Sequence, residues 1–172
     1  MVSACAVPPP PGASEPAPTP AAVAEVPQSG GALRLAFNAE VTPLDPHRAW
    51  TFPDLVVAKA LYEALVWEDA GDAAFTVRPR LAESWESSDD GLVWTFNLRS
   101  DVHFAHGTPL TAADVVFSFI DRALNPEMGF AFAQSISYID GVEAVNDQTV
   151  RFSLSKPSTT LLRDFANVPI AP

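Results

Sequence analysis

The sequence predicts a mixed α+β fold that follows an extended N-terminal segment. Residues 94–99 and 149–154 alternate apolar and polar side chains with a period of two, which is typical of half-buried strands. Between residues 54 and 65 the apolar positions recur at spacings of three and four, as on one face of a helix. Apolar residues make up 48% of the 172-residue chain and charged residues 18%, so the chain can form a hydrophobic core. We therefore expect one folded domain or part of one.

The first 30 residues differ in composition from the rest of the chain. They contain no Lys or Arg, two acidic residues and eight of the 17 prolines, mixed with Ala, Ser and Gly. Because proline lacks a backbone donor and favours the polyproline conformation, this stretch should be extended and semi-rigid. We expect residues 1–30 to be a disordered linker and residues 31–172 to be the folded part.

The only cysteine of the chain lies at the start of this linker, in the sequence Val2-Ser3-Ala4-Cys5. The tetrad resembles a bacterial lipobox, in which an aliphatic residue and two small residues precede a cysteine that receives a diacylglyceryl group. The resemblance implies a lipid anchor at Cys5, with the linker as a spacer. No basic or apolar leader precedes the tetrad in this sequence. We therefore expect either a reading frame that begins further upstream or an incidental cysteine in a disordered tail.

The folded part should open with a strand, a loop and a helix. Residues 31–37 alternate with a period of two and predict the first strand. Pro43 and Pro46 prevent regular strand pairing in the segment that follows. Asp54 is the expected N-cap of the helix, whose apolar face extends to Leu65.

A second helix should lie between the two strongest strands. Thr111 is its expected N-cap, and Asp114 places a negative charge in its first turn. Pro126 cannot continue the helix and so should end it. The side chains predicted to face the core are Val115, Val116, Phe119 and Ile120.

The two strongest strands resemble each other. Residues 90–98 and 147–154 each combine a turn with an alternating strand that has an aromatic residue at its centre. Two copies are too few for a solenoid. We expect two antiparallel strands that cover the same core.

Charge and composition exclude several classes of function. The chain has 10 Lys and Arg against 21 Asp and Glu, and its net charge of −11 argues strongly against a nucleic-acid binder that depends on phosphate contacts. One cysteine excludes a disulfide framework and a Cys-rich metal site. No apolar run approaches the ~18 residues of a transmembrane helix. His103 and His106 are three apart on an extended segment and should point to opposite faces, so we expect no metal ligands and no cofactor.

Five blocks carry a resemblance to a known family. Residues 80–86 (RLAESWE), 89–99 (DDGLVWTFNLR) and 104–115 (FAHGTPLTAADV) follow one another at family spacing. Residues 44–46 (LDP) are similar to the family's early loop, and residues 61–66 (LYEALV) to its first helix. Together they resemble family 5 of the bacterial extracellular solute-binding proteins, the peptide and nickel receptors of ABC importers.

The resemblance extends over residues 31–172 and implies part of the first lobe of a two-lobed periplasmic-binding-protein type II fold. It implies a receptor, not an enzyme, that closes around an oligopeptide and delivers it to an ABC permease for transmembrane transport. We expect a periplasmic or otherwise extracytoplasmic monomer with no nucleic-acid partner and no membrane contact other than the Cys5 anchor. The alternative ligand within the family is nickel or another small solute.

Family members are much longer than this chain, so the resemblance also implies an N-terminal fragment with an incomplete lobe. The second lobe and the residues that hold ligand termini would then be absent. A fragment of this kind should not close around a ligand. Its exposed strand edges would favour aggregation or proteolysis.

The resemblance implies two groups of ligand-binding residues. Trp50, Thr51 and Phe52 follow the early loop, which borders the family's cleft. The stretch after the second helix forms a second wall, in which Phe132 or Phe130 would stack against a ligand side chain. Ordinary packing within the lobe is the alternative interpretation of these aromatic residues.

A different class of function, an envelope serine hydrolase, depends on Ser153 and Lys156. These residues match the Ser-x-x-Lys motif of penicillin-binding enzymes. That chemistry needs the serine at a helix start, so that the lysine lies one turn away on the same face. The strand pattern and Pro157 instead place the motif at a strand end, which argues against this alternative.

Overall fold

The chain divides into two units, residues 1–36 and 37–172, and each is described here by itself. The predicted linker, including Cys5, falls almost entirely outside the residues that the computed structural model describes. The described residues are 30–32, 34–41, 44–69, 71 and 76–172.

The predicted first strand is not formed in the described residues of its range. Residues 31, 32 and 34–37 have no strand assignment, and Leu35 is 59% exposed. A strand needs a partner edge with which to exchange backbone hydrogen bonds, and sequence alternation does not reveal where that edge lies. The prediction of a strand is therefore wrong for these residues.

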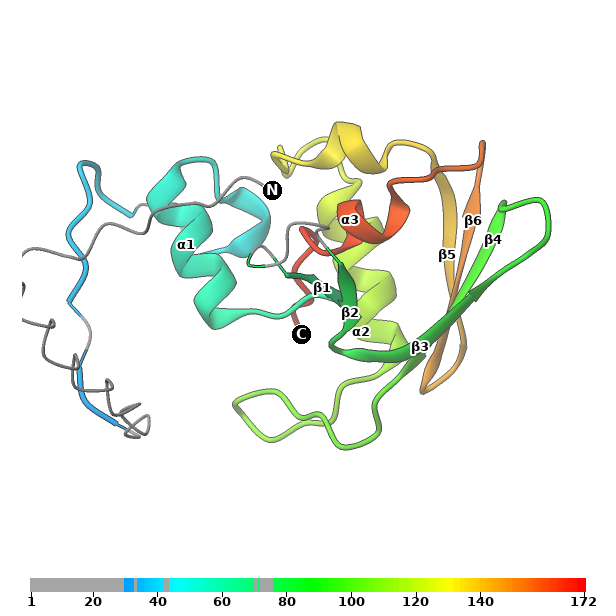
Figure 1. Ribbon diagram of the computed structural model, residues 1–172, viewed down its shortest axis with the longest axis horizontal. Coiled ribbons are helices and arrows are strands. Elements are labelled where there is room, and N and C mark those ends of the chain that lie inside the picture. Colours follow the sequence, from blue (N-terminus) through cyan, green and yellow to red (C-terminus); the bar gives the residue numbers. More distant parts are fainter. Residues whose placement is uncertain (1–29, 33, 42–43, 70, 72–75) are drawn as a thin grey trace, which may run out of the picture. The chain divides into compact units, whose positions relative to one another are not determined.

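The second unit is built on a four-stranded antiparallel sheet with the strand order β3-β4-β6-β5 (Figure 1). Trp94 lies opposite Phe152 and Phe96 opposite Val150, so β4 and β6 pair along the two segments that resemble each other. The predicted antiparallel pair is confirmed. The strands of this sheet are β3 (Ala82–Ser87), β4 (Val93–Leu98), β5 (Ile139–Asn146) and β6 (Thr149–Leu154), and a separate antiparallel hairpin consists of β1 (Val66–Glu68) and β2 (Val77–Pro79).

Helices cover one face of the sheet, which confirms the predicted mixed α+β class. In Figure 1, α2 and α3 lie on the same side of the four strands. None of the helices in the described part of the chain is both long and apolar enough to cross a membrane. The helices are η1 (Pro46–Arg48), α1 (Phe52–Leu61), α2 (Ala112–Val116), the π-helical η2 (Phe117–Ala123), η3 (Ala133–Ile136) and α3 (Leu161–Phe165).

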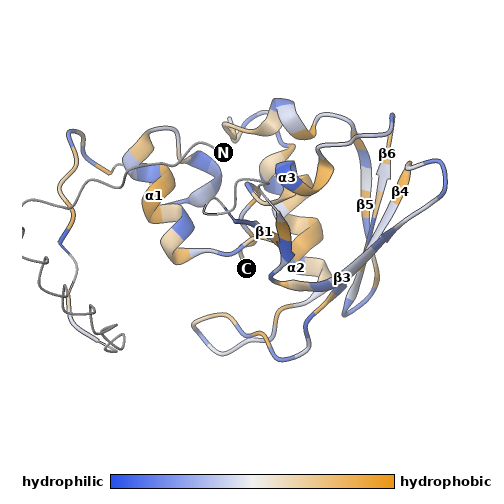
Figure 2. Ribbon diagram, viewed as in Figure 1, coloured by the Kyte–Doolittle hydropathy of each residue, from blue (hydrophilic) through white to orange (hydrophobic). Residues whose placement is uncertain are grey.

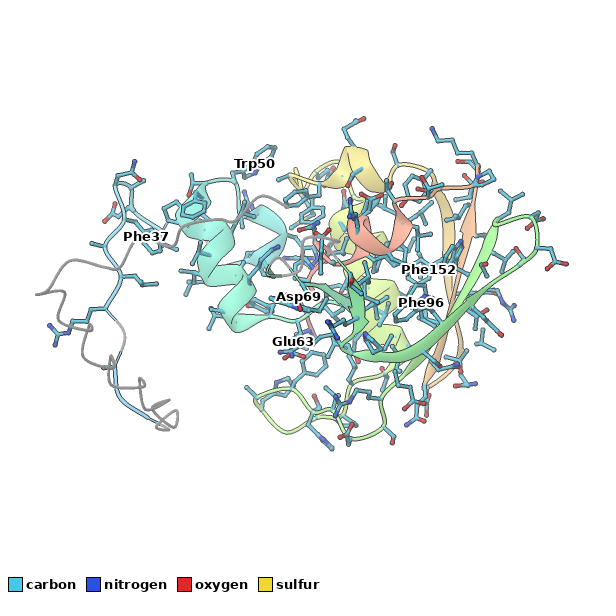
Figure 3. The ribbon with its side chains drawn as sticks, in the orientation of Figure 1. Phe37, Trp50, Glu63, Asp69, Phe96 and Phe152 are labelled. Atoms are coloured by element: carbon cyan, nitrogen blue, oxygen red, sulfur yellow. The ribbon has the colours of Figure 1, made fainter. Side chains whose placement is uncertain are left out.

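Four phenylalanines form the centre of the core. Phe96 and Phe152 extend from the sheet (Figure 3), and Phe119 and Phe165 belong to the helices. All four side chains are completely buried. The Phe152 ring lies 4.6 Å from Phe165 and 4.8 Å from Phe119, measured between centroids. Burying one such side chain contributes roughly 1.5–3 kcal/mol, and tilted or edge-on ring pairs add to it. The alternation in the two strands predicted the inward side of the sheet correctly.

The second helix changes its hydrogen-bond pattern along its length. Asp114 closes its N-terminus, since its carboxylate accepts the backbone N–H and the hydroxyl of Thr111, both at 2.8 Å. Val115 and Phe119 are fully buried as predicted, but Ile120 is 39% exposed. The prediction for Ile120 is wrong because the wider turn of η2 rotates the residues after α2 away from α-helical spacing.

The first helix begins and ends earlier than predicted. Its N-cap is Thr51 and not Asp54: the Thr51 hydroxyl oxygen accepts the Asp54 N–H at 3.3 Å, and the Asp54 carboxylate accepts the Thr51 N–H at 3.0 Å. Pro53 fits the first turn, where no backbone donor is needed. Leu65 lies beyond the helix and is buried next to β1.

The segment after α3 returns to η2 and is held there by a buried serine. The Ser118 hydroxyl donates to the Ala171 carbonyl at 3.2 Å and accepts the Ala171 N–H at 2.9 Å. The Ile170 N–H also donates to the Glu63 carbonyl at 2.8 Å. These bonds place the residues that follow α3 beside the end of α1.

Candidate functional site

The loop before α1 is attached to η2 by an ion pair. The Asp45 carboxylate accepts the backbone N–H of His47 at 3.0 Å and pairs with the Arg122 guanidinium. Asp45 and Arg122 are 77 positions apart, and their side chains are only 29% and 26% exposed. The pair therefore fixes this loop, which leads to Trp50, on the helical scaffold.

His47 fills the space between this loop and a second loop. Its side chain is completely buried, and its ring lies 5.5 Å from that of Phe130. Burial, together with the nearby charge of Arg122, lowers the pKa of His47 from 6.5 to about 4, although the Asp45 carboxylate 4.0 Å away acts in the opposite direction. The imidazole ring is therefore neutral at pH 7 and packs against Phe130 as an uncharged aromatic ring.

The three predicted binding residues at the start of α1 have different roles: Thr51 caps the helix, and the side chains of Trp50 and Phe52 are exposed. Thr51 supplies the N-cap of α1, so its side chain has a structural role whatever else it does. Trp50 is 64% exposed and Phe52 is 72% exposed. Figure 3 shows Trp50 at the start of α1, with Glu63 just past its other end. Exposed aromatic rings on an anchored loop suit contact with a ligand or a partner surface.

The structure brings the second predicted group next to the first. Gly129 has a φ of 63°, and a Cβ atom there would lie 3.6 Å from Cζ2 of Trp50. The rings of Phe130 and Phe132 are 5.7 Å apart, and Phe130 contacts His47. Phe130 is buried, whereas Phe132 is partly exposed. Two segments about 80 positions apart thus form one aromatic surface, with Phe130 as its support and Trp50 and Phe132 as its accessible rings.

A cavity of about 410 Å³ adjoins this surface. Its volume is within the range of small-molecule sites. Phe132 lines it, but Trp50, Thr51 and Phe52 do not. Figure 2 shows hydrophobic residues along α1, which supplies one wall of the cavity. The residues that line the cavity include Leu55, Ala58, Lys59, Tyr62, Trp67 and Phe132.

Sequence reasoning missed the contribution of α1 to this cavity. Leu55, Ala58, Lys59 and Tyr62 all line it, and their spacings of three and four put them on one helix face. The spacing of the apolar residues predicts a helix with one apolar face, but it does not indicate a cavity. The signal that could have revealed the site is Lys59, because a lysine within an apolar stripe is unusual for a core face.

A second cavity of about 630 Å³ includes His103, His106 and Asp101 in its lining. The His106 Nε2 atom lies 2.7 Å from the Thr108 hydroxyl oxygen, and His103 pairs with Pro109 through an isolated backbone bridge. Among the residues that the structure describes, no group of three His, Cys, Asp or Glu side chains could hold a metal ion. Leu61, Tyr62 and Glu63 line both cavities, but residues 50–52 and 129–132 do not line the second one.

Ser153 and Lys156 lie where the strand pattern placed them. Ser153 is an exposed residue of β6, and Lys156 follows the end of that strand. The serine is therefore not at a helix start, and the arrangement that the Ser-x-x-Lys chemistry needs is not formed.

Comparison with known proteins gives a consistent result. The family model for bacterial extracellular solute-binding proteins, family 5 Middle, matches residues 76–172. The periplasmic oligopeptide-binding protein OppA of Escherichia coli K12 is 35% identical over 138 residues, which cover 70% of this chain and 24% of OppA. The probable D,D-dipeptide-binding periplasmic protein DdpA of the same organism is 36% identical over 150 residues, which cover 86% of this chain and 28% of DdpA.

Solved structures of the same kind superpose on the chain. MoaA of A. tumefaciens R10, in complex with mannopinic acid, superposes with a TM-score of 0.68 and 42% sequence identity. The aligned region covers 77% of this chain and 27% of the MoaA chain. DppA of Helicobacter pylori, in complex with the peptide STSA, superposes with a TM-score of 0.67 and 27% sequence identity. The aligned region covers 78% of this chain and 29% of the DppA chain. The chain thus spans about a quarter of the length of the curated relatives it matches. The chain belongs to family 5 of the bacterial extracellular solute-binding proteins.

Proposed function

We propose that this chain is part of the substrate-binding component of an ABC importer and that it contributes one wall of a site for oligopeptides. The observation that carries the proposal is the meeting of the residue 50–52 loop with residues 129–132 beside the 410 Å³ cavity. Trp50, Phe52 and Phe132 would contact ligand side chains, and Thr51 would hold the start of α1 in place. An aromatic surface of this kind accepts different side chains, as a receptor for peptides of varied sequence requires.

The names of the relatives support a peptide as ligand. OppA is an oligopeptide-binding protein, and DdpA a probable D,D-dipeptide-binding protein. The DppA structure contains the peptide STSA. Such a receptor would work with an ABC permease in the periplasm or another extracytoplasmic space, without catalysing a reaction.

Small solutes are the second candidate, because the chain is 42% identical to MoaA, whose structure contains mannopinic acid. The NikZ structure from Campylobacter jejuni, at 28% identity, contains Ni(L-His). A nickel chelate or a solute of the size of mannopinic acid would also fit a cavity of about 410 Å³.

Calorimetric titration of the complete gene product with trialanine, mannopinic acid and Ni(L-His) would separate these candidates. We expect trialanine to bind and Trp50→Ala to weaken that binding by about tenfold, since an anchoring aromatic ring is worth 1–2 kcal/mol or more. Val145→Ala is the control, because it shortens an apolar side chain of β5 that is 45% exposed and outside the cavity. Unchanged affinity in the Trp50 variant would remove Trp50 from the site, and binding of only the other two solutes would overturn the peptide proposal.

The N-terminal segment has a proposed role that does not depend on the ligand. We propose that residues 1–30 connect the folded part to a membrane anchor at Cys5. Metabolic labelling with an alkyne-bearing fatty acid should label the wild-type protein in bacterial cells. Cys5→Ser should abolish the label, and a label that persists in this variant would exclude Cys5 as the anchor.

A further inference from the structure

His47 joins the loop that carries Trp50 to the second wall of the aromatic surface. The loop consists of residues 44–52, and the short helix η1 within it places the completely buried His47 ring 5.5 Å from the ring of Phe130. Phe130 belongs to residues 129–132, which also approach Trp50. The two segments therefore stay together as long as the imidazole ring remains buried between them.

The described surroundings of the ring contain one cation and one anion, which are already paired with each other. Arg122 reaches the loop from η2 and forms an ion pair with the Asp45 carboxylate. That carboxylate also accepts the His47 backbone N–H at 3.0 Å and lies 4.0 Å from Nδ1 of the ring. The residues after α3 contribute a backbone hydrogen bond at Pro169, and Phe130 brings no charge. A protonated ring would therefore share one carboxylate with Arg122 in a closed space, where the desolvation of a charge is costly.

The loop is separate from the centre of the core. None of residues 44–52 belongs to the cluster of buried hydrophobic side chains that includes the four phenylalanines under the sheet. The contacts that hold the loop include the half-buried pair of Asp45 with Arg122 and a bond of 3.4 Å from the Tyr62 hydroxyl to the Leu44 carbonyl. The loop can therefore move away from residues 129–132 while the sheet stays folded.

We propose that protonation of His47 releases the residue 44–52 loop from residues 129–132, so that the site binds its ligand at neutral pH and loses it in acid. The inference rests on the proposed function, since it describes the regulation of the same site. His47 is a positioning residue, because it contacts Phe130 and not the ligand. Acid favours the detached loop because the imidazolium is hydrated there and is not hydrated while the ring is buried.

The direction and the limit of the effect follow from the two states of the ring. Burial, together with the charge of Arg122, lowers the pKa of His47 to about 4 in the attached loop. In a detached loop the ring returns to water, where its pKa is about 6.5. Between these two pH values the detached form binds a proton that the attached form does not. At pH 4.5 the ratio of detached to attached loop should therefore exceed its value at pH 7 by at most about 50-fold.

The first measurement follows the loop and needs no ligand. ¹H–¹⁵N NMR spectra of the complete gene product are recorded from pH 7.0 to pH 4.5, and the indole signal of Trp50 is assigned by its absence in Trp50→Phe. We expect this signal and the amides of residues 129–132 to shift with a common midpoint, while the β4 and β6 amides stay in place. The imidazole signal of His47 in the wild type should titrate with the same midpoint, which makes this part independent of how a His47 variant folds.

Two variants separate His47 from other effects of acid. His47→Phe should abolish the shift of the Trp50 signal, and His103→Gln, which replaces an exposed histidine, should keep it. The proposal is overturned if the Trp50 signal does not change with pH, if its shift persists in His47→Phe, or if it coincides with loss of the β4 and β6 signals.

The second measurement is calorimetric titration with trialanine at pH 7.0 and pH 4.5, a range in which the peptide keeps both terminal charges. The affinity of the wild type and of His103→Gln should fall by about fivefold or more, whereas His47→Phe should keep at pH 4.5 the affinity that it has at pH 7.0. Equal losses in the wild type and in His47→Phe would overturn the coupling of His47 to binding and leave the proposed function intact. If trialanine binds at neither pH, the proposed function fails for peptides, and the NMR titration still decides whether His47 controls the loop.

Discussion

The aromatic core under the sheet and the aromatic surface before α1 use the same residue types in opposite ways. In the core, Phe152 is completely buried and contacts other rings on several sides. At the surface, Phe52 is 72% exposed, with an edge contact to Phe37 at 6.4 Å between centroids. The core rings therefore contribute to stability, whereas the surface rings contribute little to it and are available for binding. The two regions also differ in how the backbone is fixed: strand pairing holds Phe152 in the core, whereas a helix cap and an ion pair hold the loop that carries Trp50 and Phe52.

The largest expected effect is on the free energy of unfolding, which should fall much more when a core ring is removed than when a surface ring is removed. Phe152→Ala should lower the free energy of unfolding by about 3–5 kcal/mol, since it removes a large side chain from a closed core and leaves a cavity. Phe52→Ala is the matched control and should change it by less than about 1 kcal/mol. Urea denaturation followed by circular dichroism measures both. Equal losses in the two variants would show that the exposed ring is part of the core.

His47 should make the free energy of unfolding depend on pH. Between pH 6.5 and pH 4 the unfolded chain binds a proton at this ring but the folded chain does not, because the pKa of His47 falls from 6.5 to about 4. The free energy of unfolding should therefore decrease as the pH falls through this range, by up to about 3 kcal/mol from this group alone. Above pH 6.5 the group has no such effect.

The pH effect of His47 is isolated by substitution. His47→Phe should cost little at pH 7, because it replaces a neutral, buried ring with an apolar ring of similar shape, and should flatten the decrease in stability below pH 6.5. His103→Gln is the control, since His103 is exposed. Urea denaturation at pH 7.0 and pH 4.5 measures the difference, and an identical pH dependence in wild type and His47→Phe would contradict the assignment.

The smallest expected effect concerns the cap of α1. Thr51→Ala should lower the free energy of unfolding by about 1 kcal/mol, since the Asp54 N–H loses its acceptor. Thr51→Ser keeps the hydroxyl and should restore most of that stability. Thermal denaturation compares the three proteins. If the serine variant is as unstable as the alanine variant, the cap is not what the threonine side chain contributes.

Much of the fold could be predicted because its signals are local. The alternation around Phe96 and Phe152 predicted both strands and their inward sides, and the residue types at Thr111 and Asp114 predicted a helix start. The lack of a strand in the described part of residues 31–37 was not predictable, because strand formation depends on a partner edge that sequence alternation does not reveal. The exposure of Ile120 depends on the π-helical turn, for which a single sequence has no clear signal.

The candidate site was only partly predictable for the same reason. Trp50, Thr51, Phe52 and Phe132 were named from the family resemblance, and the structure shows that their two segments adjoin. Their adjacency depends on His47 and on the pairing of Asp45 with Arg122, contacts between residues far apart in the sequence. Such contacts leave no periodic pattern.

The most direct test of the account is to map ligand contacts on the protein by NMR. Trialanine is added to the ¹⁵N-labelled complete gene product, and the backbone amide shifts are followed for the residues of this chain. We expect the largest changes at residues 50–52, along the Leu55–Tyr62 face of α1, at residues 129–132 and at Asn167, with the β5–β6 hairpin unaffected. Changes that instead cluster at the second cavity around His103, or on the outer face of the four-stranded sheet, would contradict the assignment of the aromatic surface and its cavity as the binding site.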